Sequence, residues 1–285
     1  MKKAFLTPYL VFVFVLSFSQ VNIPINKREY DNYNREAAII ASMRIDLAQT
    51  WLYIVKDNLV SSNKVLVQEV YFTKAGLPEK IFYFNEDSTV NSFSIIKYNF
   101  RNLPFEEIRY TSDSSLIDGI LYEYNRNGFL SKQIFYDNKA NVIRTLVYEN
   151  IGDTIMVTSY KNDSIILFKD IIIFNDGWEN GTVKKLLKLD KNNSVIENST
   201  FVYNEFDAIR SKITYDAKNQ GVIKEFFYDD NGAVIRTVTK TDYGIILNDS
   251  SFEYDSYGNV KTIIDYNPIE KMSKLFVINY LSKTK

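Results

Sequence analysis

The stretch SFEYDSYGNVKTIIDYN, residues 251–267, contains a pattern that recurs through most of the chain. Tyr254 is followed directly by Asp255 and, four positions after the tyrosine, by Gly258. An Asp that opens a turn and a Gly that closes it are typical of a type I turn ending in a left-handed residue. The stretch therefore predicts the tip of a β-hairpin.

The same spacing repeats over about two hundred residues of the 285-residue chain. We call the Tyr or Phe before each turn the anchor; successive anchors are 24 to 29 residues apart, most often 26. The anchors are Phe72, Tyr98, Tyr124, Tyr148, Phe174, Tyr203, Tyr228 and Tyr254, and Tyr280 begins a truncated copy. Seven copies place Gly, Asn or Asp four positions after the anchor, and these residue types best tolerate positive φ. A near-constant period indicates a repeat architecture.

Each unit contains a second aromatic residue, which predicts a second strand in the unit. It lies eleven or twelve residues after most anchors, at Tyr83, Tyr110, Tyr136, Tyr160, Tyr215 and Tyr266. Between turns the strands alternate with period 2, so that Leu130, Lys132, Ile134 and Tyr136 share one expected face. We expect both sets of aromatics to lie on the more apolar, core-forming face. The pattern predicts an all-β, antiparallel meander of about sixteen strands.

Open sheets of more than about ten strands curl, split or close. A stack of hairpins with one apolar face is expected to form a curved or spiral sheet, or a sandwich. An outer-membrane barrel is the alternative, and three features oppose it. Charges occur within strands on both expected faces (Glu79 and Lys132, Glu107 and Arg109), the turns are short at both ends, and the chain ends in LSKTK.

The first residues, MKKAFLTPYLVFVFVLSFSQ, have the pattern of a secretory signal peptide over residues 1–19. Lys2 and Lys3 precede an apolar run, and the small residues Ser17 and Ser19 are spaced like a cleavage site. The run is short for a membrane span of about twenty residues, and no other run approaches that length. We expect export to the periplasm, the cell surface or the extracellular space, without a transmembrane span after cleavage.

Residues 20–63 precede the repeat domain, which covers residues 64–285. The stretch 34–57 is compatible with a short helix through Ile40, Met43 and Leu47, followed by a strand around Trp51 to Val55. Repeat arrays need a different terminal unit, so this segment is expected to cap the first hairpin.

The composition excludes several classes of chemistry. The chain has no Cys and no His, which removes disulfides, Ser-His-Asp and Cys-His catalysis, and histidine-ligated metals. The net charge of −1 gives no basic stripe for nucleic acid. No cofactor, metal site or catalytic residue is predicted.

The stretches YEYNRNG (122–128), FFYDDNG (226–232) and FEYDSYGNV (252–260) resemble the YD repeats of Rhs-like bacterial exported proteins. The resemblance covers residues 66–282; only Tyr228-Asp229 and Tyr254-Asp255 keep the full Tyr-Asp pair, and the period here is longer than the usual YD unit. It implies a β-sheet shell or spiral on an exported protein linked to surface contact or carbohydrate binding. It does not imply toxin activity, and we expect no toxin domain because the resemblance extends to residue 282.

Two kinds of candidate site remain to be weighed against simple structural roles. Asp229, Asp230 and Asp255 carry oxygen ligands suited to calcium, but they stand where the turns require such residues. Carboxylate pairs for glycoside hydrolysis could be drawn from Glu106, Glu107, Glu253 and Asp265, although no spacing brings two of them together.

Two aromatics stand outside the repeat register and are the best candidates for ligand contact. Tyr257 lies at a predicted turn tip, and Trp178 lies in the irregular copy FNDGWENG. We expect a non-enzymatic exported binding protein for a surface ligand such as a polysaccharide. The alternative is an envelope assembly component that pairs with a protein through free sheet edges; a carboxylate hydrolase is a third hypothesis.

Overall fold

A computed structural model describes residues 25–56, 59–162 and 164–282; the predicted signal peptide, residues 1–19, lies outside the described residues. The described chain has one helix, α2 (Lys27–Ser42), followed by eighteen strands, two more than expected. The strands are β1 (Ile45–Lys56), β2 (Leu59–Phe72), β3 (Pro78–Phe84), β4 (Val90–Tyr98), β5 (Pro104–Thr111), β6 (Leu116–Tyr124), β7 (Leu130–Asp137), β8 (Val142–Ile151), β9 (Thr154–Lys161), β10 (Ile165–Phe174), β11 (Val183–Asp190), β12 (Val195–Tyr203), β13 (Ile209–Asp216), β14 (Gly221–Tyr228), β15 (Val234–Thr241), β16 (Ile246–Tyr254), β17 (Val260–Asn267) and β18 (Met272–Ser282).

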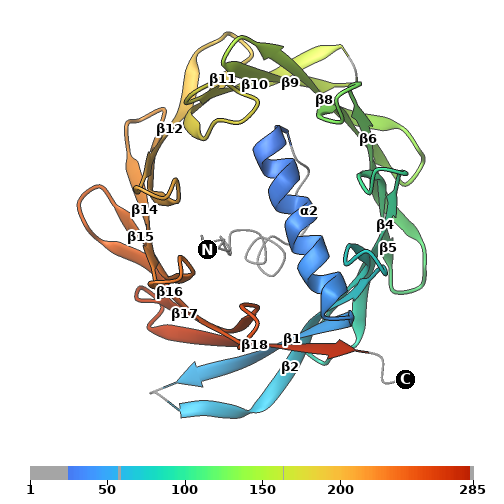
Figure 1. Ribbon diagram of the computed structural model, residues 1–285, viewed down its shortest axis with the longest axis vertical. Helices are drawn as coiled ribbons and strands as arrows, with labels where there is room; N and C mark the ends of the chain where they lie inside the picture. Colours follow the sequence, from blue (N-terminus) through green and yellow to red (C-terminus); the bar gives the residue numbers. More distant parts are fainter. Residues whose placement is uncertain (1–24, 57–58, 163, 283–285) are drawn as a thin grey trace, which may run out of the picture.

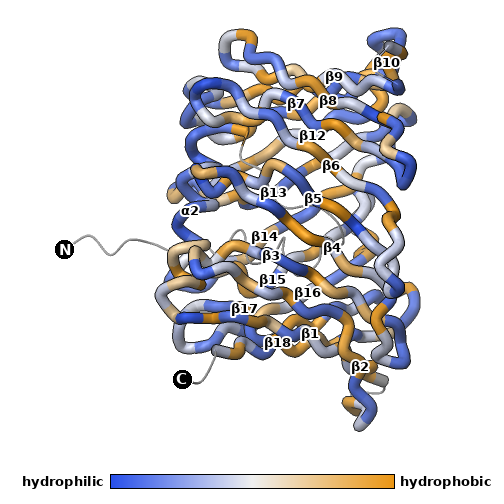
Figure 2. Tube along the Cα trace, turned by 90° about the vertical axis from the view of Figure 1, so that its right-hand side faces the viewer, coloured by the Kyte–Doolittle hydropathy of each residue, from blue (hydrophilic) through white to orange (hydrophobic). Residues whose placement is uncertain are grey.

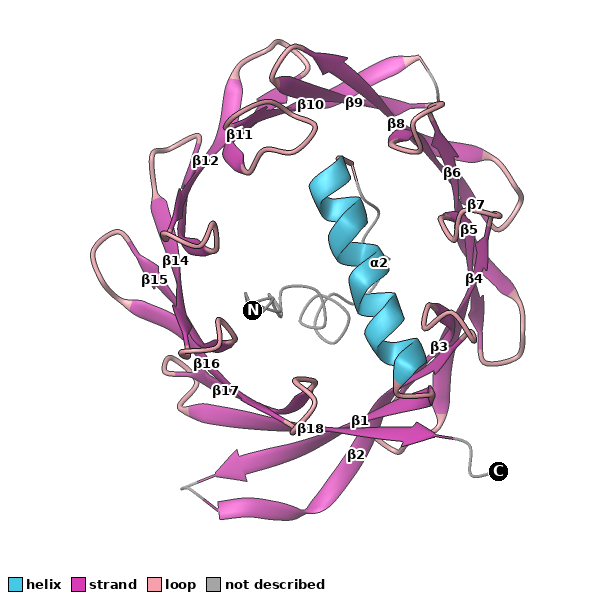
Figure 3. Cartoon of the chain, in the orientation of Figure 1, coloured by secondary structure: helices cyan, strands magenta, loops and turns pink. Residues whose placement is uncertain are grey.

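The strands close into a barrel. Each pairs antiparallel with its neighbours in the chain, and β1 pairs with both β2 and β18, so that Ala48 faces Val70 on one side and Tyr280 on the other. Figures 1 and 3 show the resulting ring of strands. The all-β antiparallel meander is confirmed, whereas the expected curved or spiral sheet is not, because the sheet closes on itself. Closure comes from β1, which lies in the segment expected to be a cap and pairs the two edges that a meander would leave open.

The hairpin tips after five anchors have the predicted geometry, whereas the tip after Tyr148 is a two-residue turn between Ile151 and Thr154. The Asp255 side chain accepts hydrogen bonds from the main-chain N–H groups of Tyr257 and Asn259, both at 2.9 Å, and Gly258 has φ of +89°. Asn99, Asn125, Asn204 and Asp229 make the same two bonds in other copies. These residues are therefore turn residues, as the sequence pattern predicted.

A β-bulge shifts the expected faces of the strands. Tyr254 pairs with Val260 but Glu253 pairs with Thr262, which leaves Lys261 as an extra residue. A bulge inserts one residue into the alternation, so the positions after it change sides. Val260 is 1% exposed and faces the interior, whereas Tyr266 is 39% exposed and faces outward.

The shift recurs across the copies and corrects the expected face for most of the second aromatics. The alternation after a bulge directs four of these side chains away from the interior: Tyr110, Tyr136, Tyr215 and Tyr266. Tyr160 also faces outward, but β8 and β9 pair without a bulge, and the two-residue turn between Ile151 and Thr154 sets its face. Tyr83, one position earlier in its copy, faces inward with Ile81. Counting with period 2 from the anchor placed these aromatics on the core face, because the count allowed for no extra residue in the strand.

Helix α2 lies across the end of the barrel at which the anchors turn. Asn26 caps the helix by accepting the N–H of Glu29 at 2.9 Å, and Arg44, with φ of 54°, reverses the chain into β1. The helix is shorter than expected at its C-terminal end, since Leu47 already belongs to β1. In the side view α2 lies at the left-hand end of the barrel, and in the axial view it crosses the ring (Figures 1 and 2).

Both ends of α2 are attached to the wall. The main-chain N–H of Lys27 donates to the carbonyl of Glu179, and the Asn26 amide donates to the carbonyl of Gly181. At the other end Gly76 packs against the α2 backbone, where an added Cβ would lie 2.0 Å from the carbonyl oxygen of Ala37. The longest and least regular copy of the repeat, around residues 174–183, therefore receives the start of the helix.

Candidate functional site

The inner surface of the barrel, which we call the lumen, changes from apolar to polar along its axis. On β16 the inward residues, starting at the anchor, are Tyr254, Phe252, Ser250 and Asn248. The apolar positions next to α2 join one core cluster that includes Val70, Ile96, Phe252 and Ile263. A ligand entering from the end opposite α2 would therefore meet polar groups first.

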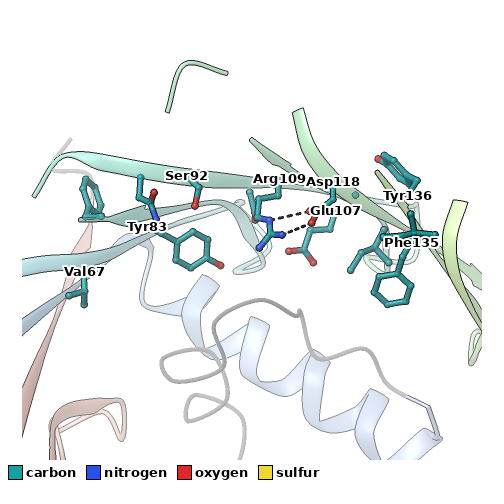
Figure 4. A pocket seen from close by; sticks show the side chains of 14 residues that line it. Val67, Tyr83, Ser92, Glu107, Arg109, Asp118, Phe135 and Tyr136 are labelled. Atoms are coloured by element: carbon teal, nitrogen blue, oxygen red, sulfur yellow. Dashed lines mark hydrogen bonds and ion pairs between the residues drawn. The ribbon is translucent and has the colours of Figure 1, made fainter. Parts of the chain in front are cut away.

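A cavity of about 500 Å³ is lined mainly by residues of β3 to β7, with Val67 of β2 and Ile143 of β8 at its margins. Figure 4 shows Tyr83, Glu107 and Phe135 on the side that faces α2, with Tyr136 turned away from it. Its polar centre is the ion pair between Arg109 and Asp118, in which the Arg109 Nε donates to Asp118 Oδ1 at 3.1 Å and a second nitrogen contacts Oδ2. The cavity thus combines aromatic faces with a planar cation and carboxylates.

Glu107 is a buried carboxylate in this wall and is only 6% exposed. It accepts a hydrogen bond from the Tyr122 hydroxyl at 3.2 Å. Burial raises the pKa of Tyr122, and the Glu107 carboxylate raises it further. Burial, assisted by the same carboxylate, raises the pKa of Tyr83 to about 12. Both phenols remain protonated at neutral pH and can serve as hydrogen-bond donors.

Arg144, on the neighbouring strand β8, lies over Phe135, with the guanidinium carbon 4.1 Å from the ring centroid. Arg144 Nε is buried and has no hydrogen-bond partner among residues 25–56, 59–162 and 164–282. Such a group is costly in a protein interior unless water or a ligand satisfies it. The aromatic face of Phe135 is thereby covered by a cation on the side of β8.

The two aromatics selected from the sequence lie away from this cavity. Tyr257 is 69% exposed at the tip between β16 and β17. Trp178 is half-buried in the loop that receives α2, and its ring meets Phe129 edge-on, with centroids 5.3 Å apart. Their proposed contact with a ligand stays a prediction.

The candidate carboxylates are distributed over both faces of the wall. Glu106 pairs with Lys97 on the outside, and Glu253 accepts the hydroxyl of Thr262 there. Glu107 and Asp265 face the lumen from β5 and β17, which lie in different parts of the ring (Figure 1). Within residues 25–56, 59–162 and 164–282, no cluster of three or more acidic side chains has a geometry suited to a metal ion.

Sequence reasoning missed the residues that give the lumen its polarity, namely Arg109, Asp118 and Arg144. A signal for them existed in the aligned copies. The position eleven residues after the anchor is Tyr83, Arg109 and Phe135 in consecutive copies, so it varies widely while its neighbours repeat. Counting with period 2 from the inward anchor, without allowing for the bulge, placed this position on the outer face of the sheet.

The outward face of the wall carries charged pairs between strands. Lys97 pairs with Glu106, and Lys240 Nζ lies 2.9 Å from a Glu225 oxygen. Arg236 Nε donates to Asp249 Oδ1 at 2.8 Å. By contrast, Glu107 and Arg109, counted among the charges that oppose a membrane barrel, face the lumen and carry no weight in that argument. None of the described helical segments combines the length and apolar character needed to cross a bilayer.

No protein-family model matches this chain, and no curated protein matches it. Among solved structures it is similar to a porin-like protein from Bacteroides uniformis, with 8% identity, a TM-score of 0.43, and coverage of 83% of this chain and 98% of that one. A porin-like protein from Bacteroides vulgatus has 9% identity and a TM-score of 0.31, with coverage of 83% and 98%.

A putative outer membrane lipoprotein-sorting protein domain from Vibrio parahaemolyticus is also similar, with 9% identity and a TM-score of 0.25, covering 89% of this chain and 94% of that one. TM-scores below 0.5 at such identities establish neither a common ancestor nor a common activity. The class that the structure itself defines is a closed, eighteen-stranded antiparallel barrel with a helix across one end and a polar lumen. Its function has to be argued from its own residues.

Proposed function

We propose that this chain is an exported, non-enzymatic binding protein that takes a saccharide into the barrel lumen. The observation that carries the proposal is the cavity of about 500 Å³ beside the Arg109–Asp118 ion pair. Its volume falls within the range of small-molecule sites, and it joins aromatic surfaces to a few convergent polar groups. The predicted signal peptide supports export.

The side chains of the cavity match the chemistry of a sugar ring. Tyr83 and Phe135 present ring surface on which the C–H face of a sugar can stack, and the Tyr83 hydroxyl adds a donor. Arg109 and Asp118 offer a donor fork and an acceptor in a fixed arrangement, because each holds the other in place. A polyol presents donors and acceptors together and can satisfy such a pair without separating its charges.

Two competing functions find less support in the fold. Assembly through free sheet edges needs unpaired strands, and β1 joins β2 to β18. Insertion in a membrane would place the outward pairs Lys97–Glu106 and Lys240–Glu225 in lipid, at a cost of roughly 2–4 kcal/mol for a lysine at the midplane. These pairs support a barrel surrounded by water.

Affinity electrophoresis of the mature protein against a panel of neutral and acidic polysaccharides tests the proposal. We expect retardation by at least one polysaccharide, and competition by its oligosaccharides should give a dissociation constant by calorimetry. Tyr83→Leu removes the stacking ring and should weaken binding about tenfold, which corresponds to about 1.4 kcal/mol. Tyr266→Leu, which alters an outward ring, is the matched control and should bind like the native protein.

Three outcomes would count against the proposal. A protein that no polysaccharide retards, and whose thermal unfolding no oligosaccharide shifts, does not bind saccharides in its lumen. Equal weakening by Tyr83→Leu and Tyr266→Leu would place the binding surface outside the cavity. If the protein hydrolyses a polysaccharide that retards it, as measured by the release of reducing ends, the protein is an enzyme rather than a binding protein.

A further inference from the structure

Two lysines face each other directly across adjacent strands in the lumen. Lys212 on β13 is in register with Lys224 on β14. Lys224 shares the inward face of β14 with Phe226, which packs against the core cluster near α2. Lys212 lies opposite Phe201 on its other side, with its Nζ 5.7 Å from the ring centroid. Both ammonium groups therefore belong to the lumen wall formed by β12 to β15.

This arrangement departs from how the lumen places three of its other cations, each of which has an acidic residue in register. Lys188 is in register with both Asp170 and Glu197, and Lys274 is in register with Asp265. Arg109 is in register with Asp118. Like charges directly opposite each other on a sheet destabilise it, and opposite charges stabilise it. Among the paired residues of the described strands, Lys212 and Lys224 are the one cation–cation pair in register.

The surroundings of the pair increase the mutual repulsion. Burial lowers the pKa of Lys224, the nearby Lys212 lowers it further, and Asp265 opposes the shift. Asp265 is already engaged, because it accepts hydrogen bonds from Asn248 at 2.7 Å and from Ser250 at 2.6 Å. Asp265 is also in register with a third lysine, Lys274, while Lys212 and Lys224 face each other across their two strands. Three ammonium groups on this wall therefore share the field of this carboxylate.

We propose that Lys212 and Lys224 together bind an anionic group, a carboxylate, sulfate or phosphate, carried by an acidic saccharide in the lumen. The inference rests on the proposed function and adds the charge class of its ligand. An anion between two ammonium groups forms charge-assisted hydrogen bonds with both and removes the repulsion between them. Two threonines add hydroxyl groups to the same wall. Thr214 lies two residues after Lys212 on β13, and Thr239 on β15 is in register with Lys224.

The test uses the mature protein with four probes: sodium sulfate, an oligogalacturonate, a sulfated oligosaccharide and a neutral oligosaccharide of the same length. Calorimetry and thermal unfolding are measured for the native protein, Lys212→Gln and Lys224→Gln. Lys132→Gln, which removes an outward lysine in register with Glu123, is the charge-matched control. We expect each lumen variant to weaken anionic probes about tenfold or more, and the control to stay within twofold. The carboxylate and sulfate arms identify which anion the ligand carries.

Lys212→Glu separates binding from a structural role. It converts the repelling pair into an attracting one, so it should raise the unfolding temperature and abolish binding of anionic probes. Anion affinities within twofold of native in both glutamine variants, or a lower unfolding temperature in Lys212→Glu, would overturn the inference. A native protein that binds the neutral oligosaccharide and no anion would overturn it while leaving the proposed function intact. Failure to bind any saccharide, with sulfate stabilisation that depends on Lys212, would reject the proposed function and retain an anion site.

Discussion

The hydroxyl of Tyr254 donates a hydrogen bond to the main-chain carbonyl of Val234, 2.7 Å away and twenty residues earlier in the chain. The same bond joins five other anchors to the first residue of an earlier strand: Tyr98 to Pro78, Tyr124 to Pro104, Tyr203 to Val183, Tyr228 to Ile209 and Tyr280 to Val260. Each carbonyl belongs to the position beside the bulge, where the ladder between strands is interrupted. These six anchors thus connect their repeats to the preceding ones as well as filling the lumen beside α2.

Tyr254→Phe should destabilise the protein by about 1 kcal/mol. The substitution keeps the ring but leaves the carbonyl of Val234, a residue only 7% exposed, without its phenol donor. Urea unfolding would measure the change. Tyr266→Phe alters a 39% exposed outward ring and serves as control, with an expected change within about 0.5 kcal/mol. Equal effects of the two variants would show that the anchor hydroxyl contributes nothing to stability.

Gly76→Ala should be far more damaging than Gly258→Ala. Both glycines have positive φ, +77° and +89°, so each substitution introduces backbone strain of about 1–2 kcal/mol. Only at Gly76 would the new methyl meet the backbone of α2, 2.0 Å from the Ala37 oxygen, whereas Gly258 has no atom within 4 Å. We expect Gly76→Ala to cost about 2 kcal/mol more, because α2 must move away from the wall. Similar costs would mean that α2 is not held against this turn; proteolysis within α2 is a second readout of its docking.

Glu29 should make the folded protein less stable as the pH rises from about 4.5 toward the raised pKa of its carboxyl in the folded state. Burial at the start of α2 raises the pKa of Glu29 from 4.5, and the bond from the Ile25 N–H only partly offsets this. The folded protein then binds more protons than the unfolded chain above pH 4.5, so a higher pH favours unfolding by up to about 1.4 kcal/mol per pH unit for one group. Below the pKa of Glu29 in the unfolded chain, the carboxyl is protonated in both the folded and the unfolded protein, and it no longer makes stability depend on pH.

Glu29→Gln should flatten this part of the profile of unfolding free energy against pH. Glu205→Gln, at an exposed turn tip, should leave the profile unchanged. A Glu29→Gln protein with the native slope between pH 4.5 and 7 would assign the dependence to other groups.

Asp255→Ala should cost about 1 kcal/mol, and Asp255→Asn should cost almost nothing. The alanine variant loses the acceptor for the N–H groups of Tyr257 and Asn259, whereas asparagine keeps that oxygen, as Asn99 and Asn125 do in their own turns. Removal of divalent cations with EDTA should leave the unfolding temperature unchanged. Dependence on calcium that is lost in Asp255→Asn would instead identify a metal site at this tip.

Much of the local structure was predictable from the sequence because local rules govern it. The turns followed from Asp or Asn at the first position and a residue tolerant of positive φ at the fourth, and Asp255 and Gly258 occupy those positions with the expected hydrogen bonds. The anchors were expected to pack in the core, and Tyr254 does so. The positions after each bulge were misassigned, because one extra residue such as Lys261 reverses the alternation without changing the composition.

The candidate site could not be predicted for a related reason. Arg109 and Asp118 are nine residues apart in the chain and meet because β5 and β6 are in register. Lys212 and Lys224 become a pair only through the register of β13 with β14, and a single sequence does not state which face of a strand is enclosed.

The sequence by itself determined the repeat, its turns, its antiparallel strands and the absence of histidine and cysteine chemistry, since these depend on residue types and short spacings. Only the tertiary structure decided that β1 joins β18, that α2 crosses one end, and that one face of the sheet becomes a lumen. Closure depends on the accumulated twist and coil of eighteen strands, which brings residues more than two hundred positions apart, such as Ala48 and Tyr280, into register. The accumulated twist and coil cannot be deduced from any short stretch of the sequence.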